Sequence, residues 1–220
     1  MKGFVSSAVE STGWLPNGFV GELLPFVLAE WEGFTVPAKV TDEDKITALF
    51  RRLLKHRIRN SERHNWMLLR EVPVESQDGT DIGWTDLRIL PPESRDEEFA
   101  FVFECKRLNI TFPSGAFKHN ADEYVDEGMM RFIEGQYSTA VHEAGILGYV
   151  MDGNTTGAQK SVVKMILARR EKLRMIARSH YSLCRLLGKM PPHGETRHRL
   201  NSGSDFILYH LLVPIRRATV

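Results

Sequence analysis

The chain has 220 residues, 42% of them hydrophobic and 26% charged, and a formal net charge of +1 at neutral pH. This composition is ordinary for a globular protein and excludes a collagen-like or largely disordered chain. No apolar run approaches the roughly 20 residues of a transmembrane helix, and the first residues lack the apolar segment of a secretory signal. The two cysteines, Cys105 and Cys184, are too far apart in sequence for a zinc motif or a disulfide framework. We therefore expect a cytoplasmic protein with reduced thiols and no membrane partner.

The charges are unevenly distributed along the chain. Residues 155–220 hold 13 Lys and Arg against 3 Asp and Glu, a net charge of +10. Residues 1–154 hold the remaining 16 Lys and Arg against 25 Asp and Glu, a net charge of −9. The basic part could hold a polyanion against the acidic part, and it fits a solvated helix face about equally well.

Two helices are predicted at the start of the chain. Residues 18–31 predict a short helix with Pro25 in or near its first turn. Residues 41–54 predict a clear amphipathic helix, with Thr41 as the N-cap and Asp44 completing a capping box. We expect residues 1–40 to form an N-terminal extension that packs on the core.

Three strands are predicted next. Residues 66–74 and 83–90 form the two arms of a hairpin around an Asp-Gly turn signal, and residues 99–106 read as a strand buried on both faces. The remaining elements follow from apolar spacing and turn signals. They are a loop over residues 109–118 lying over the site, a helix from about residue 120 to 141, a strand over residues 145–151, a long basic helix over residues 157–188 with a break near residue 179, a basic loop over residues 196–199 and a last strand over residues 204–214.

The strand over residues 99–106 ends in an unusual pair of charges. Side chains two residues apart project from the same face of a strand, so Glu104 and Lys106 point the same way. Asp86 lies on the preceding predicted strand. Neighbouring strands can bring the three residues to one place, where two carboxylates would bind a hard divalent cation and the lysine would lie beside a metal-bound water.

Asp, a spacer and then Glu-x-Lys is a pattern that resembles the PD-(D/E)XK nuclease superfamily. The first half reads Thr85-Asp86 instead of Pro-Asp, and the second half, Glu104-Cys105-Lys106, fits directly. The resemblance implies an α/β protein with a mixed sheet and a restriction-endonuclease-like core. That core would run helix, three strands, helix and strand over residues 41–154, with a C-terminal basic helix and strand over residues 155–220 completing the same domain. It also implies Mg²⁺ as the cofactor, with Mn²⁺ as a substitute, and the backbone carbonyl of Cys105 as a further ligand.

Other site residues are open to two interpretations. Glu43 either contributes to the active site, as the resemblance implies for the first core helix, or only caps that helix. Arg131 either binds a phosphate or pairs with Glu127 four residues earlier. His198, in the predicted basic loop, is a candidate for contact with phosphate. The nucleic-acid-binding set would also include three arginines of the long helix, Arg169, Arg170 and Arg174.

These observations predict a Mg²⁺-dependent endonuclease that hydrolyses phosphodiester bonds of nucleic acid, with DNA favoured over RNA. Restriction, repair and anti-phage defence are the processes that the resemblance implies. The alternative is a non-catalytic nucleic-acid-binding or scaffold subunit of a larger complex with the same fold. Either function leaves room for a partner subunit or a homodimer, because the sequence contains no motor or target-recognition motif.

Overall fold

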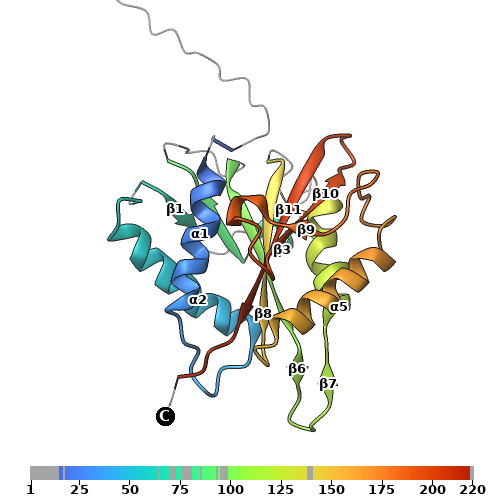
Figure 1. Ribbon diagram of the computed structural model, residues 1–220. Helices are drawn as coiled ribbons and strands as arrows, with labels where there is room; N and C mark the ends of the chain where they lie inside the picture. Colours follow the sequence, from blue (N-terminus) through green and yellow to red (C-terminus); the bar gives the residue numbers. More distant parts are fainter. Residues whose placement is uncertain are drawn as a thin grey trace, which may run out of the picture.

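The structure is a computed structural model, and a seven-stranded sheet lies at its centre with the strand order β1-β4-β5-β8-β11-β10-β9 (Figure 1). The structure describes residues 15–16, 18–63, 65–69, 73–75, 81–84, 86–92, 94, 99–137 and 141–218. The strands of the sheet are β1 (Met67–Leu69), β4 (Leu87–Leu90), β5 (Phe101–Leu108), β8 (Glu143–Val150), β9 (Ser182–Leu183), β10 (Gly194–Arg199) and β11 (Asp205–Pro214).

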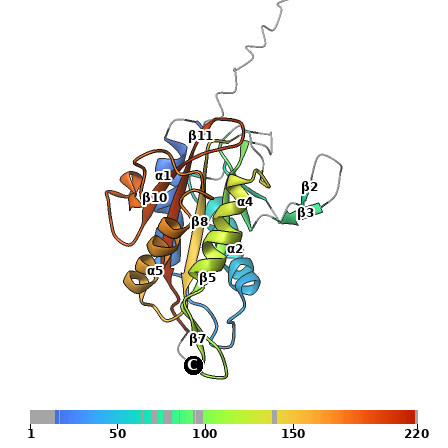
Figure 2. The same cartoon turned by 90° about the vertical axis from the view of Figure 1, so that its right-hand side faces the viewer.

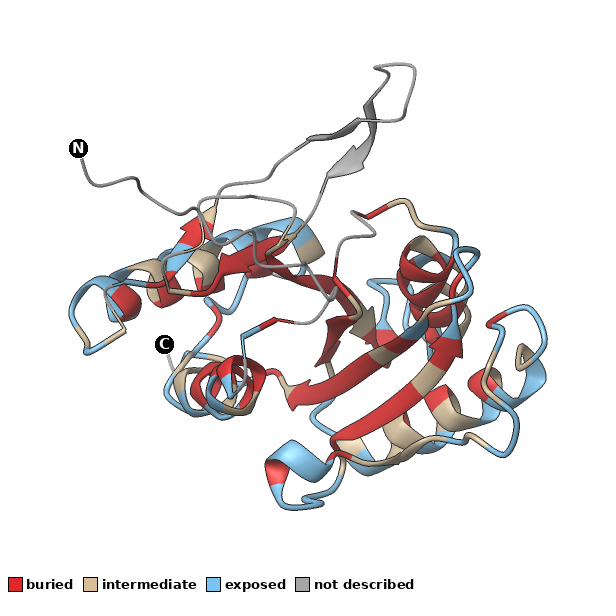
Figure 3. Ribbon diagram, turned by 90° about the horizontal axis from the view of Figure 1, so that it is seen from above, coloured by how far each residue is buried: buried red, intermediate tan, exposed pale blue. Residues whose placement is uncertain are grey.

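The sheet is mixed in orientation. β5, β8 and β11 run parallel to one another at its centre, and the outer pairs β1–β4, β4–β5, β10–β11 and β9–β10 are antiparallel. Every residue of β8 is buried, as expected for a central strand that is covered on both faces (Figure 3). The prediction of an α/β protein with a mixed sheet is confirmed.

One face of the sheet is covered by α1 (Phe19–Glu32) and α2 (Glu43–Arg59) (Figures 1 and 3). Trp31 of α1 stacks on Tyr149 of β8, with ring centroids 5.0 Å apart, and this contact holds α1 on the sheet. Residues 1–14 of the predicted N-terminal extension lie outside the described residues. Two details of the prediction were wrong. Pro25 lies inside α1, and the N-cap of α2 is Asp42, whose carboxylate accepts from the first backbone amides of the helix.

The other face is covered by α3 (Ala121–Glu123), the π-helix η2 (Tyr124–Met129), α4 (Met130–Ile133) and α5 (Thr155–Ala168) (Figure 2). The helix predicted over residues 120–141 is therefore shorter, and its middle has π-helical hydrogen bonding. The strands and helices enclose two apolar clusters, one on each face of the sheet.

The strand predicted over residues 83–90 is divided in two. β3 (Asp81–Trp84) pairs with β2 (Pro73–Glu75) in a separate two-stranded sheet, and β4 joins the main sheet. Asp86 lies between them, where its carboxylate accepts a hydrogen bond from the backbone of β5 in place of a strand partner. The hairpin pairing of the two predicted strands is retained in both sheets.

The C-terminal part departs further from the prediction. The long basic helix ends at Ala168, because residues 169–181 turn away and Arg174 and Arg178 have positive φ angles of 48° and 63°. The predicted basic loop over residues 196–199 is the end of β10, and His198 is fully buried there, so the phosphate contact considered for it was wrong. Successive side chains of a strand point to opposite faces, so Thr196 and His198 are buried while Arg197 and Arg199 point outward. The two arginines made this strand resemble a basic loop in the sequence.

The loop predicted over residues 109–118 is a hairpin of β6 (Ile110–Thr111) and β7 (Phe117–Lys118) that projects from the body (Figures 1 and 2). A short 3₁₀ turn, η3 (Arg185–Leu187), follows β9. None of the helices in the described part of the chain has the length and apolarity needed to cross a lipid bilayer.

Candidate active site at the open edge of β5

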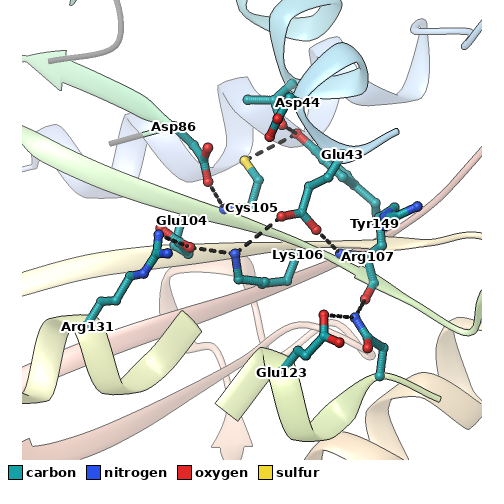
Figure 4. Close-up of polar contacts among 12 residues, drawn as sticks. Glu43, Asp44, Asp86, Glu104, Cys105, Lys106, Arg107, Glu123, Arg131 and Tyr149 are labelled. Carbon is teal, nitrogen blue, oxygen red and sulfur yellow. Dashed lines mark hydrogen bonds and ion pairs between the residues drawn. The ribbon is translucent and has the colours of Figure 1, made fainter. Parts of the chain in front are cut away.

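The edge of β5 that faces β4 is only partly paired. β4 pairs with residues 101–103 of β5, and beyond them two carboxylates take the place of a strand. Asp86 Oδ2 accepts from the backbone amide of Cys105 at 2.7 Å, and Glu43 Oε2 accepts from that of Arg107 at 2.7 Å (Figure 4). Amides at residues 105 and 107 point to the same edge because backbone groups alternate along a strand. The edge thus brings two acids from separate elements to one place.

Lys106 connects these acids to Glu104. Its Nζ lies 2.7 Å from Glu104 Oε1 and 3.2 Å from Glu43 Oε1 (Figure 4). Glu104 and Lys106 project from the same face of β5, as predicted. The structure therefore brings together Glu43, Asp86, Glu104 and Lys106. Glu43 does not only cap its helix, because its carboxylate contacts both Lys106 and the backbone of β5.

Glu104 has more partners than the sequence indicated. Arg131 Nη1 donates to Glu104 Oε1 at 3.0 Å, and the hydroxyl of Tyr137 donates to Glu104 Oε2. Arg131 Nη1 also donates to the Tyr137 hydroxyl at 3.0 Å. Arg131 pairs with Glu104 and not with Glu127, so the helical pair considered for it was wrong. The side chain of Glu104 is 0% exposed, and three donors compensate its buried charge.

The close contact of η2 with β5 depends on a glycine. A Cβ at Gly128 would lie 3.3 Å from Lys106 Cγ and 3.8 Å from Glu104 Cγ. Gly128 therefore lets the π-helix approach the two charged residues from the side opposite α2. π-helical turns are frequent at functional sites.

The charges of the site shift one another's protonation. Burial, followed by the charge of Glu104, raises the pKa of Asp86 to about 7. Burial also raises the pKa of Glu43, against the charge of Lys106. Burial by itself lowers the pKa of Lys106, but the charges of Glu104 and Glu43 raise it above its usual value overall. The site thus contains a lysine that stays protonated and a carboxyl group, Asp86, that takes up a proton near neutral pH.

The predicted nucleic-acid-binding arginines of the C-terminal part lie elsewhere. Arg169 Nε pairs with Asp126 at 3.2 Å, and Arg170 Nη1 donates to the carbonyl of Ser179 at 2.7 Å. Arg174 is exposed in the turn that follows α5. Two of the three arginines therefore support the local fold, and only Arg174 has the exposure of a free surface cation.

The resemblance indicates supporting polar residues near Gln136 and Tyr137, but the sequence did not predict the hydrogen bond of Tyr137 to Glu104 or the capping role of Asp42. Tyr137 is 33 residues from Glu104 in the chain and no spacing rule connects them. Asp42 was recognised only as an acid near the helix start, although an Asp directly before an apolar stripe is a good N-cap. The capping role of Asp42 was therefore readable from the sequence, whereas the specific hydrogen bond of Tyr137 to Glu104 was not.

The donor set suits a cation that prefers oxygen, but the described residues do not form a complete metal site. Among the described residues, no three His, Cys, Asp or Glu side chains gather closely enough to hold a metal ion. Mg²⁺ needs fewer, because it is commonly bound by one or two carboxylates and keeps several waters. No ion pair joins Asp86 to a cationic side chain in the described part of the chain, and the carbonyl of Cys105 points to the same open edge. Binding through Glu104 as well would require that residue to exchange one of its three donors for the metal.

Comparisons of the chain with protein-family models, with curated proteins and with solved structures find no match.

Proposed function

We propose that the protein is a Mg²⁺-dependent nuclease that hydrolyses phosphodiester bonds of nucleic acid, with DNA favoured over RNA. The observation that carries this proposal is the convergence of Asp86, Glu104 and Lys106 at the open edge of β5, with Glu43 beside them. These residues come from separate parts of the sequence, so a chance Glu-x-Lys match would not be expected to gather them.

The arrangement of elements around the site supports a restriction-endonuclease-like core. The order α2, β1, β4, β5, a helical segment and β8 follows the expected helix, three strands, helix and strand. The four strands are also neighbours in the sheet in that order. The small sheet of β2 and β3 would be an insertion into the first hairpin, and β9 to β11 an addition beyond β8.

The acids and the lysine would have separate tasks. Asp86, Glu104 and the carbonyl of Cys105 would hold the cation. When bound, the cation would lower the pKa of a water and offset negative charge on the phosphate. Lys106, kept protonated by its two carboxylate neighbours, would stabilise the negative charge that develops as the phosphate is attacked. This assigns the lysine an electrostatic role and not that of a general base.

Glu43 and Arg131 would orient the reacting groups. Glu43 holds Lys106 from the α2 side, while Arg131 holds Glu104 from the α4 side. The Arg131 side chain is 34% exposed, and its hydrogen bonds to Glu104 and Tyr137 use Nη1, so the rest of the guanidinium could also reach a phosphate. Positioning of this kind is required because a displacement of about 1 Å can cost about a hundredfold in rate.

The test combines metal binding with cleavage. Calorimetry with Mg²⁺ and with Mn²⁺ should show binding by the wild type and none by Asp86→Ala, with thermal melts showing that both are folded. Plasmid and single-stranded substrates should be cut by the wild type in the presence of Mg²⁺ and not by the variant. Equal metal binding by the two proteins would refute the assignment of Asp86.

The three hydrogen-bond and ion-pair partners of Glu104 favour a second candidate, a non-catalytic nucleic-acid-binding or scaffold subunit. All three donors to Glu104 come from the protein itself, as in a structural ion cluster. This candidate predicts nucleic-acid binding that neither Mg²⁺ nor Asp86→Ala changes. Cleavage, alone or with a partner subunit added, would eliminate it.

A further inference from the structure

The hairpin of β6 and β7 presents two aromatic rings at its tip. Phe112 and Phe117 have 42% and 50% of their surface exposed. The tip is held by two backbone hydrogen bonds of 2.8 Å, from Phe112 to the carbonyl of Ala116 and from Gly115 to the carbonyl of Phe112. An ordered turn with two half-exposed rings, projecting from the body, has the form of a contact element (Figures 1 and 2).

The base of this hairpin is attached to the candidate active site. The carbonyl of Arg107 accepts from Asn120 Nδ2 at 3.0 Å, while the Arg107 amide donates to Glu43. Phe112 follows Lys106 by six residues, which span at most about 20 Å in an extended chain. That span corresponds to about six stacked nucleotides at about 3.4 Å each. A strand held at Lys106 can therefore reach the tip.

The charge of the hairpin agrees with a nucleic-acid ligand. No Asp or Glu occurs in residues 107–121, although residues 1–154 as a whole are strongly acidic. Lys118, at the base, pairs with Glu123 at 2.7 Å, so the hairpin adds little net charge and the tip is apolar. Such a tip does not repel a phosphate backbone. Its contribution to the binding of nucleic acid would come from contact with the faces of bases.

We propose that Phe112 and Phe117 stack on unpaired bases of a nucleic acid whose backbone lies along the open edge of β5. The choice of nucleic acid as the ligand rests on the proposed function. Base stacking on aromatic side chains tolerates any sequence, because every base has a π face. The hairpin would thus favour single-stranded or frayed segments over intact duplex.

The experiment measures binding without cleavage. Fluorescence anisotropy in EDTA compares a labelled single-stranded oligonucleotide with one of the same length that carries abasic positions and the same phosphates. The wild type should bind the complete oligonucleotide more tightly, by about fivefold or more for each stacked base. The double variant Phe112→Ala/Phe117→Ala should bind the two oligonucleotides equally. Loss of the difference in the variant isolates stacking from the attraction of the phosphates.

A matched control removes exposed apolar surface elsewhere. Leu167 and Leu186 are 53% and 42% exposed, and Leu167→Ala/Leu186→Ala should retain the wild-type difference between the oligonucleotides. A wild type that binds neither oligonucleotide, or both equally, overturns the proposal, even if the double variant fails to fold. A dimer or a vesicle-bound form that the double variant abolishes, without a base-dependent difference, also overturns it. Base-dependent binding without cleavage of plasmid or single-stranded substrates in Mg²⁺, alone or with a partner subunit added, would refute the nuclease and leave the hairpin assignment standing.

Discussion

The ammonium of Lys106 lies 2.7 Å from Oε1 of Glu104, inside a cluster that also supplies Glu104 with donors from Arg131 and Tyr137. Removal of the lysine therefore leaves the buried carboxylate with two of its three partners. This separates the two tasks that Lys106 could have, support of Glu104 and stabilisation of charge on a substrate.

The first prediction concerns this separation. Lys106→Ala should fold with a loss of about 2 to 3 kcal/mol in the free energy of unfolding, less than for a buried ion pair with no other partner. It should bind Mg²⁺ and nucleic acid and fail to cut, because the cation beside the developing charge is lost. Urea melts, calorimetry and a plasmid-cleavage assay measure these three properties.

The control for this variant is Lys160→Ala, which removes an exposed lysine of α5. Its stability should change by less than about 0.5 kcal/mol, and cleavage should be unaffected. A Lys106→Ala protein that still cuts would mean that the active site lies elsewhere.

Local sequence patterns predicted the helix and the strand that carry the site better than they predicted the contacts between its distant residues. An apolar run ending in Glu104 and Lys106, and acids ahead of an amphipathic helix, each depend on neighbouring residues only. The sequence therefore predicted the buried strand and α2. The helix predicted over residues 157–188 is correct to Ala168 and wrong beyond it, because basic residues with helical spacing also occur in turns, such as the one where Arg174 and Arg178 have positive φ angles. The partnership of Glu104 with Tyr137 joins residues across a turn whose path depends on packing.

The second prediction concerns the raised pKa of Asp86. Its pKa is about 7 in the folded protein, because of burial and then the charge of Glu104, against about 4 when unfolded. The folded state then holds the extra proton between pH 4 and 7, so this group's stabilising contribution is lost as the pH rises through 7. Asp86→Asn keeps an acceptor for the Cys105 amide and carries no charge. In EDTA at pH 8 it should be about 1 to 3 kcal/mol more stable than the wild type, and this advantage should vanish near pH 4.

Mg²⁺ should reverse the order of stability of the wild type and Asp86→Asn. A ligand that binds only the folded state stabilises it by about 2.7 kcal/mol at a hundred times its Kd. The wild type should gain stability on addition of Mg²⁺ and Asp86→Asn should not. Chemical denaturation at pH 8 with and without Mg²⁺ measures both effects, and an Asp86→Asn protein that is less stable in EDTA would contradict the electrostatic account.

The third prediction compares two glycines that face β5. A Cβ at Gly145 would lie 2.5 Å from two ring atoms of Phe103, so Gly145→Ala should cost at least about 1 to 3 kcal/mol through overpacking. A Cβ at Gly128 would lie 3.3 Å from Lys106 Cγ, a flexible side chain that can move by a few tenths of an ångström. Gly128→Ala should therefore change stability by less than about 1 kcal/mol and reduce the cleavage rate more than it weakens nucleic-acid binding.

Thermal melts and single-turnover cleavage separate these two effects. If Gly128→Ala cuts at the wild-type rate, the π-helix does not set the position of Lys106.

The last prediction concerns a buried hydrogen-bond chain beneath the π-helix. His198 Nδ1 lies 2.8 Å from the carbonyl of Leu173, which can only accept, so His198 donates there and its Nε2 accepts from Thr196 Oγ1 at 2.7 Å. Thr196 then accepts from His210 Nε2 at 2.8 Å, and His210 Nδ1 accepts from the Tyr124 hydroxyl at 3.0 Å. The two neutral histidines must therefore be opposite tautomers.

Nitrogen-15 NMR should find the proton of His198 on Nδ1 and that of His210 on Nε2. Thr196→Val keeps the shape of the side chain but leaves Nε2 of both rings without its partner, at a cost of about 2 to 4 kcal/mol, whereas Thr196→Ser should cost less than about 1.5 kcal/mol. Burial lowers the pKa of His198 to about 4, and burial and the charge of His198 lower that of His210 to about 3. Only the unfolded chain binds these protons as the pH falls below 6.5, so each histidine should reduce stability by up to about 1.4 kcal/mol per pH unit from there to pH 4. Urea melts from pH 7 to pH 4 should show a shallower decline for His210→Gln than for the wild type, and identical slopes, or matching tautomers, would contradict the assigned direction of the chain.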